Sequence, residues 1–354
     1  MLGADNDLNT VSIEYARIGR AYWYPQNELS QSLPVEWNHW WSYEDRDIDE
    51  RVFRENADVA GRLGVEVCTL DAGWFGPATP GAHWYDYRGD WDKVNTIRFP
   101  GGIRALSDYV HSKHMKFGLW CEIEALGKHA RLGEEHPEFV ALRDGERLGY
   151  VCFGNPAVQE WAFQTLERLV TEYRCEWIKL DFNVDPGAGC DRLDHGHGAG
   201  DGLFEHYLGY YRTLGKIRER HPGVILENCS SGGLRIDLAI LKQTHLTFLS
   251  DPDWPEHGLQ LLWGASTMLA PEVLLHWGWP NGSMNIRTRR SIRGTPISSN
   301  INSTTTCASP CWREPGSRRG SRSFQSGWPI ATLTTSRCTA NTSDVSFVRP
   351  TYSG

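Results

Sequence analysis

The chain has 354 residues, of which 40% are hydrophobic and 12% aromatic, and this length allows one large domain or two medium ones. The formal net charge is −8, and because residues 286–354 hold ten Arg, no Lys and two acids, the remainder carries −16, which argues against nucleic acid as a partner. The nine Cys show no CxxC pair or metal-finger spacing, and no signal peptide or membrane-spanning run is visible, so we expect a cytoplasmic protein without a membrane partner.

Short apolar strands alternate with amphipathic helices between residues 34 and 285. Strands are predicted at 35–41, 65–76, 115–124, 175–183, 223–229, 246–251 and 272–279. Helices are predicted at 47–64, 102–114, 155–173, 202–221, 234–243 and 256–269. This alternation predicts a parallel sheet, and we interpret residues 34–285 as an α/β fold of the (β/α)8 TIM-barrel type with about seven recognisable strands. A doubly wound open sheet is the alternative, but no phosphate-binding Gly loop follows the first strand.

The two flanking segments differ from the barrel. Residues 1–33 are a lead-in that starts with a polar, strand-like stretch, so we expect the chain to begin inside a longer gene. Residues 286–354 hold 13 Ser, 11 Thr, three Cys and two Trp without periodicity, and they read either as a disordered tail or, in our hypothesis, as the product of a reading frame shifted near residue 285. Either way the eighth strand is predicted to be missing, which leaves the first and seventh strands with unpaired edges.

The strand CEWIKLDFN carries three polar residues at every second position. Alternate side chains of a strand share a face, so Lys179, Asp181 and Asn183 are predicted to face the barrel lumen. Burying these groups is costly without a purpose. We predict that Asp181 is the nucleophile of a glycosidase and that Lys179 holds it ionised. A structural ion pair is the alternative.

The segment LSDPDW ends the sixth predicted strand with Asp251. Retaining glycosidases need two carboxyl groups about 5–5.5 Å apart, and Asp251 is predicted to be the acid/base that faces Asp181. Its pKa would have to be raised, and Pro252 and Trp254 supply surroundings of low polarity. Asp253 is the competing residue, and a helix N-cap is the structural alternative for Asp251.

Two Gly-containing segments also follow predicted strands. In DAGWFG (71–76), Asp71 is predicted to accept hydrogen bonds from two sugar hydroxyls beside an exposed Trp74, with a turn Asp as the alternative. In ENCSSGG (227–233), small residues would let the backbone approach a ligand closely, although an ordinary strand-to-helix turn fits equally well. The Trp-rich composition is consistent with sugar stacking and also with a large aromatic core.

The remaining polar motifs carry weaker predictions. In DHGHG, His195 and His197 suggest a metal site, but a flexible solvated loop is favoured because no third ligand is evident. Glu122 and Glu124 in WCEIE are predicted to take part in polar packing of the lumen.

The ordered motifs WNHWW, LDAGWFG, WCEIE, IKLDFN, ENCSSGG and LSDPDW resemble the strand ends of glycoside hydrolase family 36, the α-galactosidases called melibiases. The resemblance covers roughly residues 34–280. It implies a retaining double displacement on a small α-galactoside such as melibiose or raffinose, without a metal ion or other cofactor. It leaves homo-oligomer formation open.

The resemblance also implies roles for individual residues. Asp181 matches the nucleophile, Asp251 the acid/base, and Asp71 a ligand of the sugar's O4 or O6 hydroxyl. The other substrate-binding matches are Lys179, Asn183, Trp74, Arg147, Trp40 (with Trp41 as the alternative), Cys229 and Gly232. The chain departs from the family at Ala72, where members often carry a second Asp, and it lacks the family's N-terminal β-sandwich and C-terminal β-domain.

Three alternative functions stay open. The same site could act on α-N-acetylgalactosaminides or transfer the galactosyl group to another sugar. The chain could be a catalytically inactive sugar-binding fragment. A metal-dependent barrel hydrolase that uses His195, His197 and Asp191 is the third.

Overall fold

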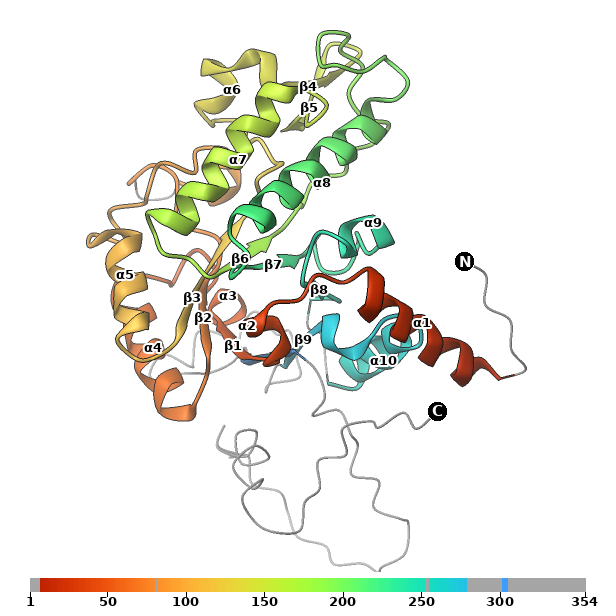
Figure 1. Ribbon diagram of the computed structural model, residues 1–354. Coiled ribbons are helices and arrows are strands. Elements are labelled where there is room, and N and C mark those ends of the chain that lie inside the picture. The colour runs from red at the N-terminus through yellow and green to blue at the C-terminus, as the bar shows by residue number, and fades with distance from the viewer. Residues whose placement is uncertain (1–6, 80–81, 252–254, 279–300, 305–354) are drawn as a thin grey trace, which may run out of the picture.

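The computed structural model, drawn in Figure 1, describes residues 7–79, 82–251, 255–278 and 301–304. Seven parallel strands form most of a barrel wall, with the larger helices outside it. These strands are β1 (Val35–Asn38), β2 (Val67–Leu70), β3 (Lys116–Cys121), β6 (Trp177–Leu180), β7 (Ile225–Asn228), β8 (Leu246–Phe248) and β9 (Leu274–Gly278). Each lies inside a predicted strand, so the predicted α/β barrel fold is confirmed. The strands are shorter than predicted because the polar residues at their ends belong to loops.

The expectation of unpaired edges on the first and seventh strands is wrong. A short strand, β10 (Ile301–Thr304), lies between β9 and β1 and pairs with both in the antiparallel sense. The closed order is β1-β10-β9-β8-β7-β6-β3-β2. No eighth parallel strand occurs within the residues the structure describes. Edge N–H and C=O groups need partners, and four residues from much later in the chain supply them.

The large predicted helices form where their apolar periodicity places them. They are α4 (Glu50–Leu63), α5 (Gly102–His111), α7 (Pro156–Thr171), α8 (Gly202–Arg220) and α10 (Pro255–Ser266). The shorter helical elements are α2 (Glu28–Gln31), α3 (Trp40–Tyr43), α6 (Leu132–Glu135), α9 (Leu238–Leu241), η1 (Trp84–Tyr87), η2 (Pro137–Phe139) and η3 (Pro271–Val273). Across the part of the chain described here, none of the helices combines the length and apolar character that a bilayer crossing needs.

The polar segment near the N-terminus is helical, not strand-like as expected. Helix α1 (Leu8–Tyr22) begins at Asp7, whose side chain accepts a hydrogen bond from the backbone N–H of Asn9 at 3.2 Å. Its buried residues are Ala16 and Gly19, which are small and give little hydrophobic signal in the sequence. An ion pair between Arg20 and Glu272 ties this helix to the segment before β9.

A two-stranded hairpin between β3 and α7 was not predicted. It consists of β4 (Val140–Arg143) and β5 (Glu146–Val151), which pair in the antiparallel sense. The turn is Asp144–Gly145, and both residues have positive φ, at 52° and 83°. Asp-Gly is a strong hairpin signal because two-residue turns of this type need left-handed backbone at both positions. The sequence therefore carries a local signal for this hairpin.

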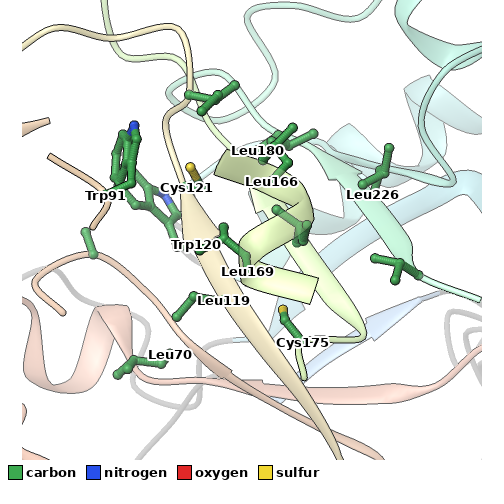
Figure 2. Close-up of a cluster of buried hydrophobic side chains, with 14 of the residues drawn as sticks. Leu70, Trp91, Leu119, Trp120, Cys121, Leu166, Leu169, Cys175, Leu180 and Leu226 are labelled. Atoms are coloured by element: carbon green, nitrogen blue, oxygen red, sulfur yellow. The ribbon is translucent and has the colours of Figure 1, made fainter. Parts of the chain in front are cut away.

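The apolar core lies between the barrel wall and the helices. Figure 2 shows Leu166 and Leu169 of α7 beside Leu119 and Cys121 of β3, with Leu180 of β6 in the same cluster. Ile178 and Leu180 belong to this outer core, as the alternation in CEWIKLDFN predicts. The polar positions of that strand are therefore left to face the other way, toward the lumen.

Candidate active site

Acidic side chains gather where the parallel strands end. Asp71 directly follows β2, Glu122 follows β3, Asp181 follows β6, and Asp251 comes shortly after β8. The carboxyl ends of the strands meet at one rim of a barrel, which is where barrel enzymes carry their active sites. Glu227 lies close to this rim in the sequence of β7, but it is part of the strand and is fully buried. The candidate site is therefore built on the four acids named above.

Asp181 is held by four N–H donors. The indole of Trp120 at 3.2 Å and the side-chain amide of Asn183 at 2.8 Å donate to Oδ2. The backbone N–H groups of Phe182 at 2.8 Å and Ser231 at 3.0 Å donate to Oδ1. Both carboxylate oxygens are therefore fixed in position, and the residue keeps 9% exposure. A carboxylate with this rigidity suits attack along a defined direction.

Lys179 forms an ion pair with Asp71, with Nζ 3.2 Å from Oδ2. That Lys179 holds Asp181 ionised stays a prediction. Burial by itself would lower the pKa of Lys179, but Asp71, followed by weaker acidic neighbours that include Asp181, raises it above its ordinary value. The ammonium also lies 3.9 Å from the ring centre of Trp277 and 4.9 Å from that of Phe248. Leu70 of β2 pairs with Leu119 of β3, which pairs with Ile178 of β6, so Asp71, one residue further on, comes level with Lys179. The cation is thus a buried charge shared by the carboxylates of the rim.

The pKa of Asp251 is raised to about 6, although part of its side chain is exposed. Desolvation by the surrounding protein is the largest cause, Lys179 opposes the shift, and repulsion from Asp181 and Asp71 adds to it. A carboxyl group with this pKa is largely protonated in weakly acidic solution, so it can donate a proton there.

The start of the next helix excludes the alternative that Asp251 is a helix N-cap residue. Helix α10 begins at Pro255, so Asp251 is too far upstream to be its N-cap residue. Pro252, Asp253 and Trp254, which were expected to modulate or replace Asp251, lie outside the described residues.

The loop after β7 contacts both candidate acids. Ser231, whose φ is +45°, donates its backbone N–H to Asp181. Gly232 also has positive φ, at +86°, and a Cβ built there would lie 3.1 Å from the backbone nitrogen of Asp251. Cys229, at the start of the loop, is buried. The small residues therefore allow close approach of one backbone segment to another, where the sequence suggested approach to a ligand.

The aromatic side chains near the rim are arranged differently from the prediction. Trp74 was expected to be exposed, but it is fully buried and its indole donates to the carbonyl of Trp120 at 2.9 Å. Its ring packs against the rings of Phe75, Trp91 and Tyr173, so it is not open to a sugar. Trp40 is half-buried and lies edge-on to Trp84, with ring centres 5.7 Å apart, and Trp84 in turn lies 5.3 Å from Trp120. Trp41 is half-buried as well.

Arg88 is a buried residue that sequence reasoning missed. Its guanidinium forms an ion pair with Glu122 at 2.8 Å and lies 3.4 Å from the ring centre of Tyr85. Glu122 accepts hydrogen bonds from the backbone N–H of Asn183 at 2.5 Å and from its side chain at 3.3 Å. Burial raises the pKa of Glu122 to about 7, with Arg88 opposing the shift and Asp181 adding to it. Glu122 therefore orients Asn183, which orients Asp181, so it does more than fill the lumen.

Glu124 likewise takes part in polar packing, as predicted. Its carboxylate accepts from His206 at 3.0 Å and from Arg235 at 2.9 Å, and all three residues are buried.

Arg147 is not brought to the acidic rim. It is exposed on β5 and borders a hollow of about 580 Å³. The other residues that line this hollow are Pro137, Glu138, Val140, Leu142 and Arg192. Within the described part of the chain, no hydrogen bond or ion pair joins Arg147 to Asp71, Asp181 or Asp251. Its predicted role in binding substrate stays a prediction.

A parallel α/β barrel with a fixed carboxylate and a second carboxyl group of raised pKa at its rim has the architecture of a barrel glycoside hydrolase. The chain belongs to the Melibiase family, whose model matches residues 1–297. This result confirms the resemblance drawn from the six motifs.

Individual relatives agree with the family match. The chain is 30% identical over 284 residues to α-galactosidase Mel36A of Lactobacillus acidophilus, and the matched region covers 78% of this chain and 38% of that protein. It is 29% identical over 279 residues to an Escherichia coli α-galactosidase, and the matched region covers 75% of this chain and 37% of that protein. The chain thus spans about two fifths of the length of these curated relatives.

Solved structures share the fold. The α-galactosidase AgaA of Geobacillus stearothermophilus superimposes with a TM-score of 0.71 at 24% identity, over 81% of this chain and 41% of that one. Variants of that enzyme have been solved in complex with stachyose and with raffinose.

Proposed function

We propose that this chain is the catalytic barrel of a retaining exo-α-galactosidase that releases terminal α-galactosyl residues from oligosaccharides. The observation that carries the proposal is the contrast between two acids of one rim. Asp181 is fixed by four N–H donors, whereas Asp251 has its pKa raised to about 6. Two carboxyl groups in unlike environments are what a nucleophile and an acid/base require.

The reaction proceeds in two displacements at the anomeric carbon. Asp251 gives its proton to the glycosidic oxygen while Asp181 attacks the carbon, so the bond to the leaving group breaks and a galactosyl ester forms. Asp251 then takes a proton from water, which attacks the same carbon and releases Asp181. Two inversions give net retention. No step needs a cofactor.

The comparisons support the substrate class. The relatives named above are α-galactosidases, and the complexes of AgaA with stachyose and raffinose are consistent with galactosyl oligosaccharides as substrates. The family resemblance supports Asp71 and Asn183 as ligands of sugar hydroxyls, and both directly follow barrel strands or lie close after one. The resemblance implies a carboxylate at position 72 in many members, so Ala72 would lack one such contact.

The pH profile of aryl α-galactoside hydrolysis tests the role of Asp251. With a pKa of about 6, Asp251 carries its proton below this pH and loses it above this pH. Since the protonated form is the one that acts as the acid, kcat/KM should fall about tenfold for each pH unit above 6. Asp251→Ala should remove this alkaline limb, lower kcat, and regain turnover with added azide. A wild-type chain that binds galactose without any turnover would contradict the proposal and favour an inactive sugar-binding fragment.

Gly232→Ala should lower kcat/KM by roughly 10- to 100-fold, because the new methyl group displaces the backbone at Asp251. The matched control is Gly64→Ala, since Gly64 also has positive φ, at +78°, but no atom lies within 4 Å of its added Cβ. Both changes should destabilise the fold by about 1 kcal/mol through backbone strain, as urea unfolding would measure. Equal loss of activity in the two variants would show that Gly232 does not position Asp251.

A further inference from the structure

A second cluster of reactive side chains lies apart from the acidic rim. Cys152, Cys190, His195 and His197 are all buried, and their sulfur and nitrogen atoms lie within 4.8 Å of one another. Cys152 directly follows β5, and the other three lie in residues 184–201, the later part of the connection between β6 and α8. The predicted flexible, solvated loop around the two His is therefore wrong. The further candidate ligands, which the sequence did not reveal, are the two Cys side chains. Their spacing from the two His forms no recognisable metal-binding motif.

Backbone carbonyl groups hold both imidazoles in the tautomer that suits binding of a metal ion by the other ring nitrogen. His195 Nε2 lies 2.7 Å from the carbonyl oxygen of Glu138, and His197 Nδ1 lies 2.8 Å from that of Gly198. A carbonyl only accepts, so each of these nitrogens carries the proton. The other nitrogen of each ring is then left with a lone pair directed into the cluster. Metal-binding His residues are commonly oriented by such a backbone carbonyl.

Two sulfur–nitrogen separations within the cluster match those around a tetrahedral ion. Cys152 Sγ lies 3.2 Å from His197 Nε2, and Cys190 Sγ lies 3.5 Å from His195 Nδ1. A tetrahedral Zn²⁺ with bonds of about 2.3 Å to sulfur and 2.0–2.1 Å to nitrogen holds these two atom types roughly 3.5 Å apart. All four ligand atoms lie within 4.8 Å of one another, so a bound ion would draw the more distant pairs closer together.

The backbone closes tightly around this cluster. A Cβ built on Gly154 would come within 2.4 Å of the His197 ring, and one built on Gly202 would come within 2.9 Å of it. The ring of His197 is therefore confined from two sides. Asp191, which the metal-hydrolase alternative used as a ligand, instead accepts from the backbone N–H of Asp144 at 2.8 Å and is not part of the cluster.

We propose that Cys152, Cys190, His195 and His197 form a structural Zn²⁺ site that fastens the connection after β6 to the end of the β4–β5 hairpin. Two thiolates and two imidazoles complete a tetrahedral shell, so no position stays open for catalysis. Soft sulfur ligands select zinc over magnesium or calcium. Binding releases the thiol protons to solvent, up to two per ion.

The position of the proposed metal site suggests that it stabilises the segment next to Asp181. The 184–201 connection contains no helix or strand, and loops of this length rarely hold one conformation without a constraint. It starts directly after Asn183, which donates to Asp181. Phe182, next to Asp181, packs in one buried cluster with Cys152 and Cys190. The metal site therefore secures the segment that orients the candidate nucleophile.

Metal analysis of the purified chain tests this proposal without relying on activity. After expression with zinc and dialysis under reducing conditions, the wild-type chain should hold about one zinc ion per chain. Replacement of the zinc by Co²⁺ should give the visible bands of tetrahedral cobalt and the near-ultraviolet absorption of cobalt bound to thiolate. A reduced wild-type chain that takes up neither zinc nor cobalt would overturn the proposal.

Single substitutions locate the ion. Cys190→Ser and His197→Gln should each lower the zinc content at least about tenfold. Cys175→Ser is the matched control, because Cys175 is also buried but donates to the carbonyl of Trp177 at 2.8 Å, and it should keep its zinc. Retention of zinc in the Cys190 and His197 variants would refute the site, as would a disulfide between Cys152 and Cys190 in the freshly isolated chain. Loss of hydrolysis with zinc still bound would count against the proposed function alone.

Discussion

Asp181→Ala is expected to lower kcat for an aryl α-galactoside at least about 10³-fold, because the attacking carboxylate is removed while the rest of the rim stays in place. Alanine is a better replacement than asparagine. Both oxygens of Asp181 accept from N–H groups, so an asparagine amide would turn a donor toward a donor. Release of the aryl group, followed by absorbance, measures the loss.

Azide separates the roles of the two acids by stereochemistry. In Asp181→Ala, azide would attack the anomeric carbon directly and expel the phenolate, and this single displacement yields the β-galactosyl azide. In Asp251→Ala, azide would attack the galactosyl ester on Asp181, and two displacements yield the α anomer. Proton NMR distinguishes the products. The reverse assignment of anomers would mean that the two roles are exchanged.

The control for Asp181→Ala is Asp108→Ala, which removes an exposed carboxylate of α5 that pairs with Arg104 and Arg174. It should leave kcat within about twofold of the wild-type value, since exposed ion pairs contribute little. Unchanged hydrolysis in Asp181→Ala would exclude it as the nucleophile.

Lys179→Met should reduce the free energy of unfolding by about 3–5 kcal/mol. The substitution removes a buried cation, with 4% of the side chain exposed, and leaves Asp71 charged without its ion pair. Burial without a counter-ion costs several kcal/mol per charge, and methionine fills a similar volume, so the loss reports electrostatics more than packing. Urea unfolding followed by tryptophan fluorescence measures it.

Two further variants make this result specific. Lys216→Met removes a lysine that also pairs with a carboxylate, Glu160 at 2.9 Å, and lies 3.8 Å from the ring centre of Phe163, but about half of its side chain is exposed. It should cost less than about 1 kcal/mol. Adding Asp71→Asn to Lys179→Met should recover part of the lost stability. Equal costs for the two lysines would show that the Lys179 charge is not a buried counter-ion.

The metal site and the acidic rim are linked by a short stretch of chain. Asp181, Phe182 and Asn183 lie between strand β6 and the connection that carries Cys190, His195 and His197. Glu122 holds Asn183 from the other side. The rigidity of the candidate nucleophile thus comes from β3, the residue after it and the loop after β7 as much as from its own strand.

Local periodicity was enough to predict most of the barrel from the sequence. Apolar strands and amphipathic helices are encoded within a few residues, so their order predicted the parallel α/β architecture. Alternation along CEWIKLDFN separated Ile178 and Leu180 from the polar positions in the correct sense. Helix α1 was not predicted because the side chains on its core face are small. The β4–β5 hairpin was not predicted either, although the dipeptide Asp144–Gly145 favours a hairpin turn.

The sequence by itself determined which residues carry polar chemistry and that they end parallel strands, because a strand has a period of two and parallel strands share one direction. Only the tertiary structure decided the partners. It gave Lys179 to Asp71, buried Trp74, closed the barrel edge with β10 and assembled two cysteines and two histidines around one point. Such pairings join segments distant along the chain, and they depend on distances across the barrel that no local pattern records.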